Sequence, residues 1–251
     1  MVKKWNVTIP ALSGDAPRQA YISLPASYDK CPDARYPVLY LFDGQNIFFD
    51  RDATFGKSWG MDAYLRKSRR ELIVVAVECN REGNRRLAEY SPFSCQISHY
   101  GAIEGQGDAY LNWMITNLKP YIDRSYRTFP DREHTAVGGS SMGGLMALYG
   151  VSAYNSVFQK AVCLSPSLWI APDKVTNMVK NTKYARDTAV YLDYGEKEMF
   201  SHAANPEILL TTAQNLLKKR VNLTFRIVPG GSHCEASWEK QVPIFMDCLE
   251  L

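Results

Sequence analysis

Two near-continuous apolar runs constrain the fold of this chain more than any other feature. They are PVLYLF at Pro37–Phe42 and LIVVAVE at Leu72–Glu78. A strand with one wet face alternates apolar and polar residues, so a continuous apolar run is typical of a strand covered on both faces. Such strands occur mostly in parallel sheets with helices on each side. The two runs therefore predict an α/β architecture.

The remaining chain alternates predicted strands with helical patterns, and we find no internal repeat or long linker. Further strands are predicted at 5–10, 18–24, 134–138, 158–164, 188–194 and 222–228, and helices at 107–122, 142–150, 173–180, 206–219 and 235–249. This order predicts a single domain over residues 1–251, with a mostly parallel central sheet of about eight strands and helices on both faces. In such sheets the chemistry lies at the carboxyl ends of the strands.

Composition and charge exclude several classes of function. The chain has 251 residues, of which 46% are hydrophobic, and a net charge of +3 without charged blocks. That balance gives no electrostatic case for binding nucleic acid or an anionic membrane. The pair Arg85-Arg86 is interpreted as solvated surface. The N-terminus MVKKWNVTIPALSG has no apolar signal segment, and no apolar run is long enough to span a bilayer, so a cytoplasmic protein is expected.

The cysteines give no indication of a metal or redox site. All six lack the C-x-x-C spacing of structural zinc sites and dithiol motifs. Phe55-Gly56-Lys57-Ser58 contains the GKS of a phosphate-binding loop, but the position of that loop's first glycine is held by Arg51. No metal and no organic cofactor are expected.

The stretch GGSSMGG at 138–144 matches G-x-S-x-G only with Ser141 in the centre, because the frame of Ser140 places Met142 where glycine is needed. It joins a predicted strand to a predicted helix. A serine displayed on such a turn has a strained backbone and needs tiny neighbours, which explains glycine at 139 and 143. Ser141 is therefore the candidate nucleophile.

A nucleophilic serine needs a base, and the chain has four histidines, at 99, 134, 202 and 233. His134 begins the strand that precedes the serine, at the wrong end of the sheet. His233 lies in PGGSH, between the last strand and the last helix, on a loop free to reach Ser141. His233 is the candidate base.

The acid should follow the strand predicted at 188–194. Glu198 lies several residues past its end and is favoured, while Asp193, still within the strand, and Glu196, earlier in the turn, remain alternatives. The order Ser, acid, His is that of α/β-hydrolases. The backbone N–H of Met142, at the start of the helix, and that of Gln45, after the strand 37–42, are expected to form an oxyanion hole. Asp43 is interpreted as a carboxylate that organises this loop.

With these residues assigned, the chain resembles the putative esterase family of α/β-hydrolases, which includes esterase D-like enzymes, feruloyl and acetyl xylan esterases, siderophore esterases and mycolyltransferases. The matching segments run from about Pro37 to Trp238. They include VLYLFDGQNIFFD, RRLAEYSPF, the region around GGSSMGG, YLDYGEKE and PGGSHCEASW. The resemblance implies Ser141 as nucleophile, His233 as base and Glu198 as acid. Some siderophore esterases of this kind resemble Ser-His dyads, so a dyad remains an alternative.

The expected function is a serine esterase acting through an acyl-enzyme on short-acyl or carbohydrate-linked esters of the acetyl or feruloyl type. Tyr90, Phe93 and Trp169 follow strands at the same sheet edge and are expected to line the substrate pocket, with ordinary aromatic packing as the alternative. The partner is expected to be a small-molecule ester or acylated sugar. Acyl transfer, siderophore ester hydrolysis and a non-catalytic binding role remain as alternative functions.

Overall fold

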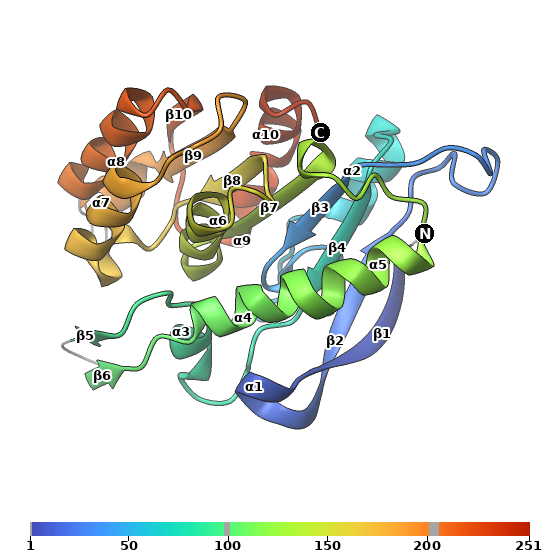
Figure 1. The fold of residues 1–251 in the computed structure, drawn as a ribbon, viewed down its shortest axis with the longest axis horizontal. Coiled ribbons are helices and arrows are strands. Elements are labelled where there is room, and N and C mark those ends of the chain that lie inside the picture. The colour runs from blue at the N-terminus through green and yellow to red at the C-terminus, as the bar shows by residue number, and fades with distance from the viewer. Residues whose placement is uncertain (1, 98–100, 201–205) are drawn as a thin grey trace.

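The computed structural model describes residues 2–97, 101–200 and 206–251, and its centre is an eight-stranded sheet of order β1-β2-β4-β3-β7-β8-β9-β10 (Figure 1). The strands are β1 (Val2–Ile9), β2 (Gly14–Ser23), β3 (Val38–Leu41), β4 (Ile73–Val77), β7 (Thr135–Ser140), β8 (Lys160–Leu164), β9 (Ala189–Gly195) and β10 (Asn222–Val228). β2 is antiparallel to β1 and β4, and every pair from β4 to β10 is parallel. The predicted mostly parallel sheet is confirmed.

Helices follow most of the parallel strands. They are α1 (Pro10–Ser13), α2 (Met61–Ser68), α3 (Arg85–Glu89), α4 (Gly107–Trp113), α5 (Lys119–Ser125), α6 (Met142–Ala153), α7 (Pro172–Asn181), α8 (Pro206–Lys218), α9 (Glu235–Glu239) and α10 (Val242–Cys248). A π-helical turn at Met114–Leu118 joins α4 to α5, and Figure 1 shows the two as one long helix crossing the sheet. A small hairpin of β5 (Cys95–Ile97) and β6 (Gly101–Ile103) stands apart from the sheet.

Side chains of the central strands alternate between two cores, one on each face of the sheet. In β4, Ile73, Val75 and Val77 belong to one core, whereas Val74 and Ala76 belong to the other. The first core contains residues of α4, α6, α7 and α8, and the second contains residues of α2, α9 and α10. This two-sided burial explains why the strands are apolar at nearly every position.

The parallel strands β3, β4, β7, β8, β9 and β10 deliver their loops to one edge of the sheet, where the loop after β4 carries Cys79. The loop after β3 begins at Asp43, β7 leads into Ser141, and β8 leads into Ser165; the loops after β9 and β10 carry Glu198 and His233. β7 lies between β3 and β8, so Ser141 occupies the middle of this edge. The order of strands therefore positions the candidate residues before any side-chain contact is considered.

Several helices differ from the expectation: α1, α2 and α3 were not predicted, and two of the predicted helices have other bounds. The closing helix predicted at 235–249 is divided into α9 and α10, and Pro243 lies in the first turn of α10. Proline has no N–H and clashes with the preceding turn, so it favours a new helix start over continuation. The helix predicted at 107–122 continues to Ser125. Among the described residues, no helix has the length and apolar character needed to cross a bilayer.

Candidate active site

Ser141 lies on a sharp turn between β7 and α6, with φ 56° and ψ −120°. Non-glycine residues with positive φ are uncommon, and they concentrate where surrounding structure holds them. The N–H of Ser141 donates to the carbonyl of Leu164 at 2.9 Å, and its own carbonyl accepts from the N–H of Ser167 at 3.0 Å. The turn is therefore fixed against the neighbouring strand β8 and the loop that follows it.

The glycines around Ser141 are required by close contact between strand and helix. A Cβ on Gly139 would lie 2.6 Å from the carbonyl carbon of Gly143, and a Cβ on Gly143 would lie 3.0 Å from Cβ of Phe42. Neither position has room for a larger residue without backbone movement. The sequence pattern thus reflects packing at the turn, as the strand-turn-helix interpretation requires.

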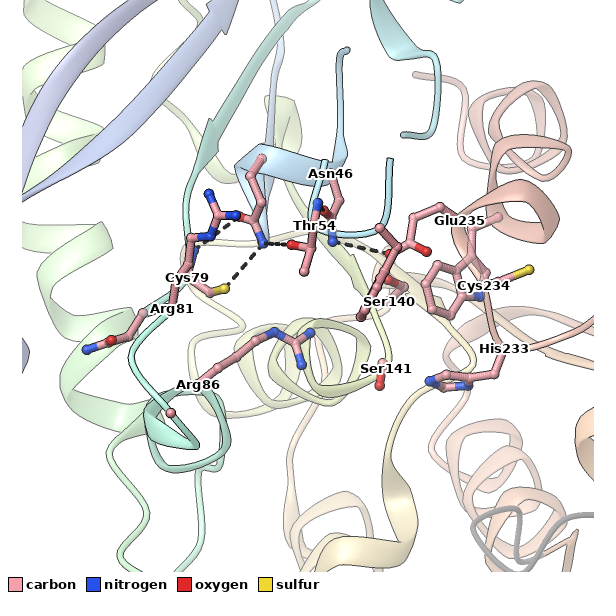
Figure 2. A pocket seen from close by; sticks show the side chains of 15 residues that line it. Asn46, Thr54, Cys79, Arg81, Arg86, Ser140, Ser141, His233, Cys234 and Glu235 are labelled. Atoms are coloured by element: carbon pink, nitrogen blue, oxygen red, sulfur yellow. Dashed lines mark hydrogen bonds between the residues drawn. The ribbon is translucent and has the colours of Figure 1, made fainter. Parts of the chain in front are cut away.

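His233 and Glu198 are joined by a hydrogen bond of 2.6 Å between Nδ1 and Oε2. The Glu198 side chain is only 5% exposed, whereas that of His233 is 46% exposed. Figure 2 shows the imidazole ring of His233 turned toward the hydroxyl of Ser141. The hydroxyl of Ser141 also lies 3.2 Å from that of Ser167. One end of the imidazole is therefore held by a carboxylate while the other faces the candidate nucleophile.

The environment of Glu198 favours its ionised form. Burial opposes ionisation, but the hydrogen bonds from His233 and Ser165 outweigh it, so the pKa of Glu198 lies below its usual value. Its Oε1 accepts from the Ser165 hydroxyl at 2.7 Å and from the N–H of Gly195 at 2.9 Å. A buried carboxylate with these donors is suited to stabilise a protonated imidazole.

The two alternative acids have other partners. Asp193, at 1% exposure, accepts from the N–H of Ser165 at 3.2 Å, and its burial raises the pKa of the carboxyl to about 7. Glu196 accepts from the N–H of Gly230 at 2.8 Å. Of the three carboxyls, Glu198 is the one that the structure brings to His233. His134 bonds to Asp131 before β7 begins, and His99 and His202 lie outside the described residues.

The loop after β3 is built around Asp43, which has φ 56°. Its carboxylate forms two hydrogen bonds of 2.7 Å with Nε and Nη2 of Arg86, so it organises the loop as expected. Arg86 was interpreted as solvated surface, and this is wrong: its side chain is 29% exposed and paired with a buried carboxylate. The sequence did contain a signal for this ion pair, because Asp43 and Arg86 carry opposite charges and follow the adjacent strands β3 and β4.

Gln45 and Met142, the expected oxyanion donors, both lie beside the turn. Gln45 is 1% exposed and its side chain is anchored by Cys79, whose Sγ lies 3.2 Å from Nε2 and whose N–H donates to Oε1 at 3.3 Å. Met142 is the first residue of α6, where backbone N–H groups have no acceptor within the helix. Gly44 precedes Gln45 in the loop after β3. A Cβ on Gly44 would lie 2.8 Å from the backbone of Val77, so the loop after β3 approaches β4 closely.

A cavity of about 640 Å³ opens over Ser141 and His233. Figure 2 shows its walls, which come from the loops after β3, β4, β7 and β10. Arginine, amide and carboxylate groups line the cavity together with the aromatic side chains of Phe55 and Trp238. The lining residues are Gln45, Asn46, Thr54, Phe55, Cys79, Asn80, Arg81, Gly83, Arg86, Ser140, Ser141, His233, Cys234, Glu235 and Trp238.

None of the three aromatic residues expected in the pocket lines this cavity. Tyr90 is fully buried, packs against Phe42 and accepts from the N–H of Asp43 at 3.2 Å. It therefore supports the loop after β3 from the core side. Phe93 packs edge-on against Tyr149, and Trp169 is partly buried against the first core. The prediction for these residues is wrong for this cavity, because a place at the correct edge does not fix the direction of a side chain. Packing, the alternative considered, is what the structure has.

Several cavity residues were missed by sequence reasoning. Asn46 and Glu235 form a hydrogen bond of 3.2 Å on the cavity wall, and burial, followed by the charge of Asp43, raises the pKa of Glu235. Both residues stand next to assigned ones, Asn46 after Gln45 and Glu235 two positions after His233, which was the available signal. Within the ranges described, no group of three or more His, Cys, Asp or Glu side chains is arranged to hold a metal ion.

Comparison with known proteins gives a consistent family. An uncharacterised protein of Bacillus subtilis strain 168, YbbA, is 24% identical over 186 residues, covering 72% of this chain and 69% of that protein. A ferulic acid esterase superposes with a TM-score of 0.70 at 19% identity, covering 99% of this chain and 97% of that one. The enterobactin and salmochelin hydrolase IroE superposes with a TM-score of 0.67 at 20% identity, covering 100% of this chain and 95% of that one.

At these identities the superpositions establish a shared α/β-hydrolase fold. The family assignment comes from the sequence, since residues 13–244 match the profile of the family described as "Putative esterase". That match spans nearly the whole chain, including the turn at Ser141 and the loops that carry Glu198 and His233. The chain therefore belongs to the putative esterase family, and its class of activity is that of an ester hydrolase.

Proposed function

We propose that this protein is a serine carboxylic-ester hydrolase that works through an acyl-enzyme, with Ser141 as nucleophile, His233 as general base and Glu198 as the acid that orients it. The observation that carries the proposal is the 2.6 Å hydrogen bond from His233 to buried Glu198, next to a serine at φ 56°. A nucleophile, a base facing it and a third group holding the base form the arrangement that activates a serine hydroxyl.

In the first step, the Ser141 oxygen attacks the ester carbonyl carbon while His233 takes the hydroxyl proton. The tetrahedral intermediate collapses as the bond to the alcohol oxygen breaks, and His233 returns its proton to that oxygen. Water then attacks the acyl-enzyme with His233 again as base, and the carboxylic acid product is released from Ser141. Glu198 keeps the imidazole in one orientation and stabilises its protonated form throughout.

The backbone N–H groups of Met142 and Gln45 would hold the oxyanion of each tetrahedral intermediate. The start of α6 contributes its dipole in the same direction. Donors fixed by the fold need no reorganisation when charge develops, which is why such groups often supply the largest single contribution to catalysis.

Short-acyl or carbohydrate-linked esters, of the acetyl or feruloyl type, are the proposed substrates. The cavity of about 640 Å³ has the size of a small-molecule site, and its amide, arginine and carboxylate groups suit polar substrates better than long aliphatic chains. The similarity to a ferulic acid esterase agrees with this choice. Siderophore ester hydrolysis is the second candidate, supported by the similarity to an enterobactin and salmochelin hydrolase.

The test is hydrolysis of a series of p-nitrophenyl esters, from acetate to laurate, beside methyl ferulate, with Ser141→Ala as control. We expect turnover that falls with acyl length and that Ser141→Ala lowers by about 10⁴-fold or more without unfolding the protein. A folded Ser141→Ala variant with near wild-type turnover would sink the mechanism. Wild-type protein inactive on every ester would favour the siderophore ester, acyl transfer to an alcohol, or a non-catalytic binding role; labelling of Ser141 by a fluorophosphonate would separate the last from the others.

A further inference from the structure

Ser165, which no part of the proposed mechanism uses, occupies a special position behind the acid. It follows β8 with φ 42° and is 1% exposed. Its backbone N–H donates to Asp193, at 3.0 Å to the carbonyl and 3.2 Å to Oδ1. A buried serine in the left-handed region is uncommon and persists only where its surroundings over-determine it. The fold therefore holds this residue in a fixed place between β8 and β9.

The hydrogen bonds of the Ser165 hydroxyl have only one possible direction. The indole Nε1 of Trp238 lies 3.0 Å from Oγ of Ser165, and Oε1 of Glu198 lies 2.7 Å from it. An indole N–H is a donor only, so Oγ must accept from Trp238. A hydroxyl has a single hydrogen, and it is then directed at the carboxylate of Glu198.

These hydrogen bonds form a series that runs from Trp238 through Ser165 and Glu198 to His233. Glu198 uses Oε1 for Ser165 and Oε2 for His233, so the two oxygens fix the plane of the carboxylate. The terminal torsion of a glutamate has no sharp preference of its own, and hydrogen bonds must therefore define it. Trp238 also packs edge-on against the His233 ring, with 5.0 Å between ring centroids. One tryptophan thus contacts both Ser165 and His233, the residues on either side of Glu198.

We propose that Ser165 is a positioning residue for the acid Glu198, and that Trp238 orients the Ser165 hydroxyl for this role. The inference rests on the proposed function, because it assumes that Glu198 orients His233 in catalysis. Ser165 touches no substrate and acts only through Glu198. Its hydroxyl supplies a charge-assisted hydrogen bond, the kind that contributes most in a buried setting.

Loss of this hydroxyl should change the pH dependence as well as the rate. Hydrogen bonds to the ionised form help keep the pKa of Glu198 low against burial. Without Ser165, the carboxylate is protonated more readily and, while ionised, binds the imidazolium proton more tightly. Both effects move the acid limb of the kcat/KM profile to higher pH. Asp193 and Tyr194 of β9 also titrate beside Glu198 and stay unchanged in the variants.

The experiment measures kcat, KM and pH profiles of Ser165→Ala, Ser165→Gly, Trp238→Phe and the double variant Ser165→Ala/Trp238→Phe on p-nitrophenyl acetate. We expect kcat of Ser165→Ala to fall by about 10- to 100-fold, the loss typical of a charge-assisted hydrogen bond, with KM changed less than about twofold. Ser165→Gly accepts φ 42° without strain, so it reports the missing hydroxyl even where alanine perturbs folding. Phenylalanine keeps an aromatic ring beside His233 and loses the indole N–H that acts through Ser165, so the double variant should be no slower than Ser165→Ala.

Ser152→Ala is the matched control, since Ser152 is also buried and its hydroxyl lies 2.7 Å from that of Tyr184, away from the cavity. It should keep the wild-type kcat and pH profile. Folded Ser165 variants with wild-type kcat, or with a loss that is uniform across pH, would overturn the inference. Wild-type protein without turnover that depends on Ser141 would instead overturn the proposed function, so the two failures are distinguishable.

Discussion

Asp193 and Glu198 are buried carboxyls of the same segment, yet they ionise in opposite ways. Burial, reinforced by the charge of Glu198, raises the pKa of Asp193 to about 7, although hydrogen bonds from Ser165 and Tyr191 lower it. For Glu198, hydrogen bonds from His233 and Ser165 outweigh burial and the pKa is lowered. At pH values between the two pKa values, Asp193 is therefore neutral and Glu198 is charged, and of these two carboxyls Glu198 is the one that contacts the imidazole.

The raised pKa of Asp193 makes stability depend on pH. An unfolded aspartate has a pKa of about 3.9, so between pH ~4 and 7 the folded state binds a proton that the unfolded chain does not. The contribution of this residue to the free energy of unfolding therefore falls as pH rises through that window. Asp193→Asn removes the titration and keeps an oxygen for the N–H of Ser165. We expect its stability relative to wild type to increase by about 2 kcal/mol from pH 5 to 8, measured by urea unfolding; a difference independent of pH would contradict this.

At the scale of single residues, the sequence predicted what depends on local pattern and missed what depends on direction. The spacing of Gly139 and Gly143 identified the turn at Ser141, and the steric requirement at Gly139 is local, because a Cβ there would meet Gly143; the requirement at Gly143 comes from Phe42, which is distant in the sequence. Ser165 had no such signal, since its partners come from β9 and α9, which become neighbours only in the folded sheet. For Tyr90 the sequence predicted the correct edge of the sheet but the wrong direction of the side chain, because the ring is buried in the core.

At the scale of elements, two loops that lie far apart in the chain are joined over the cavity. Asn46, at the end of the loop after β3, donates to Oε1 of Glu235 at the start of α9, at 3.2 Å. Asn46 also accepts from the N–H of Thr54 at 2.9 Å. Its neighbour Gln45 is a proposed oxyanion donor and Glu235 lies two residues from His233. The amide of Asn46 therefore connects the oxyanion loop to the histidine loop.

Truncation of Asn46 should loosen this connection. We expect Asn46→Ala to lower kcat/KM on p-nitrophenyl acetate by about 3- to 10-fold, the effect of one lost hydrogen bond, mainly through kcat because the N–H of Gln45 becomes less well fixed. Arg51→Ala, a change in the same segment between β3 and α2 but outside the cavity, serves as control. Steady-state kinetics identical for Asn46→Ala and wild type would show that the two loops hold their places independently.

The elements themselves were mostly predictable from the sequence. All eight strands of the sheet were expected. In β3, β4, β8 and β9, burial on both faces produces the nearly continuous apolar run that identifies such strands, whereas β10 is only partly buried. The π-helical turn at Met114–Leu118 was not expected; it ends two residues before Pro120, whose missing N–H interrupts the regular bonding of a helix. The division of the last helix before Pro243 has the same cause. The periodicity of apolar residues predicts that a helix is present, but it does not take account of a proline within the helix.

For the whole molecule, the sheet divides the interior into two cores that touch different helices. Val175 of α7 is fully buried in the core that contains α4, α6, α7 and α8, and Val242 of α10 is 1% exposed in the other. Side chains within each core share neighbours, whereas the backbone of the sheet separates the two cores. Cavities made on opposite faces should therefore relax independently.

This separation predicts additive losses of stability. Val175→Ala and Val242→Ala each remove two buried methyl groups, which should cost about 2 kcal/mol apiece from lost burial and the small cavity left behind. In the double variant the costs should add to within about 0.5 kcal/mol, as they do for distant sites with no shared partner. Urea unfolding of the four proteins measures this, provided that all show the same slope against denaturant. A coupling above about 1 kcal/mol would mean that the strands bend together when either layer is thinned. In that case the edge that carries Ser141, Glu198 and His233 would respond to packing on both faces, and core substitutions far from the cavity should change kcat.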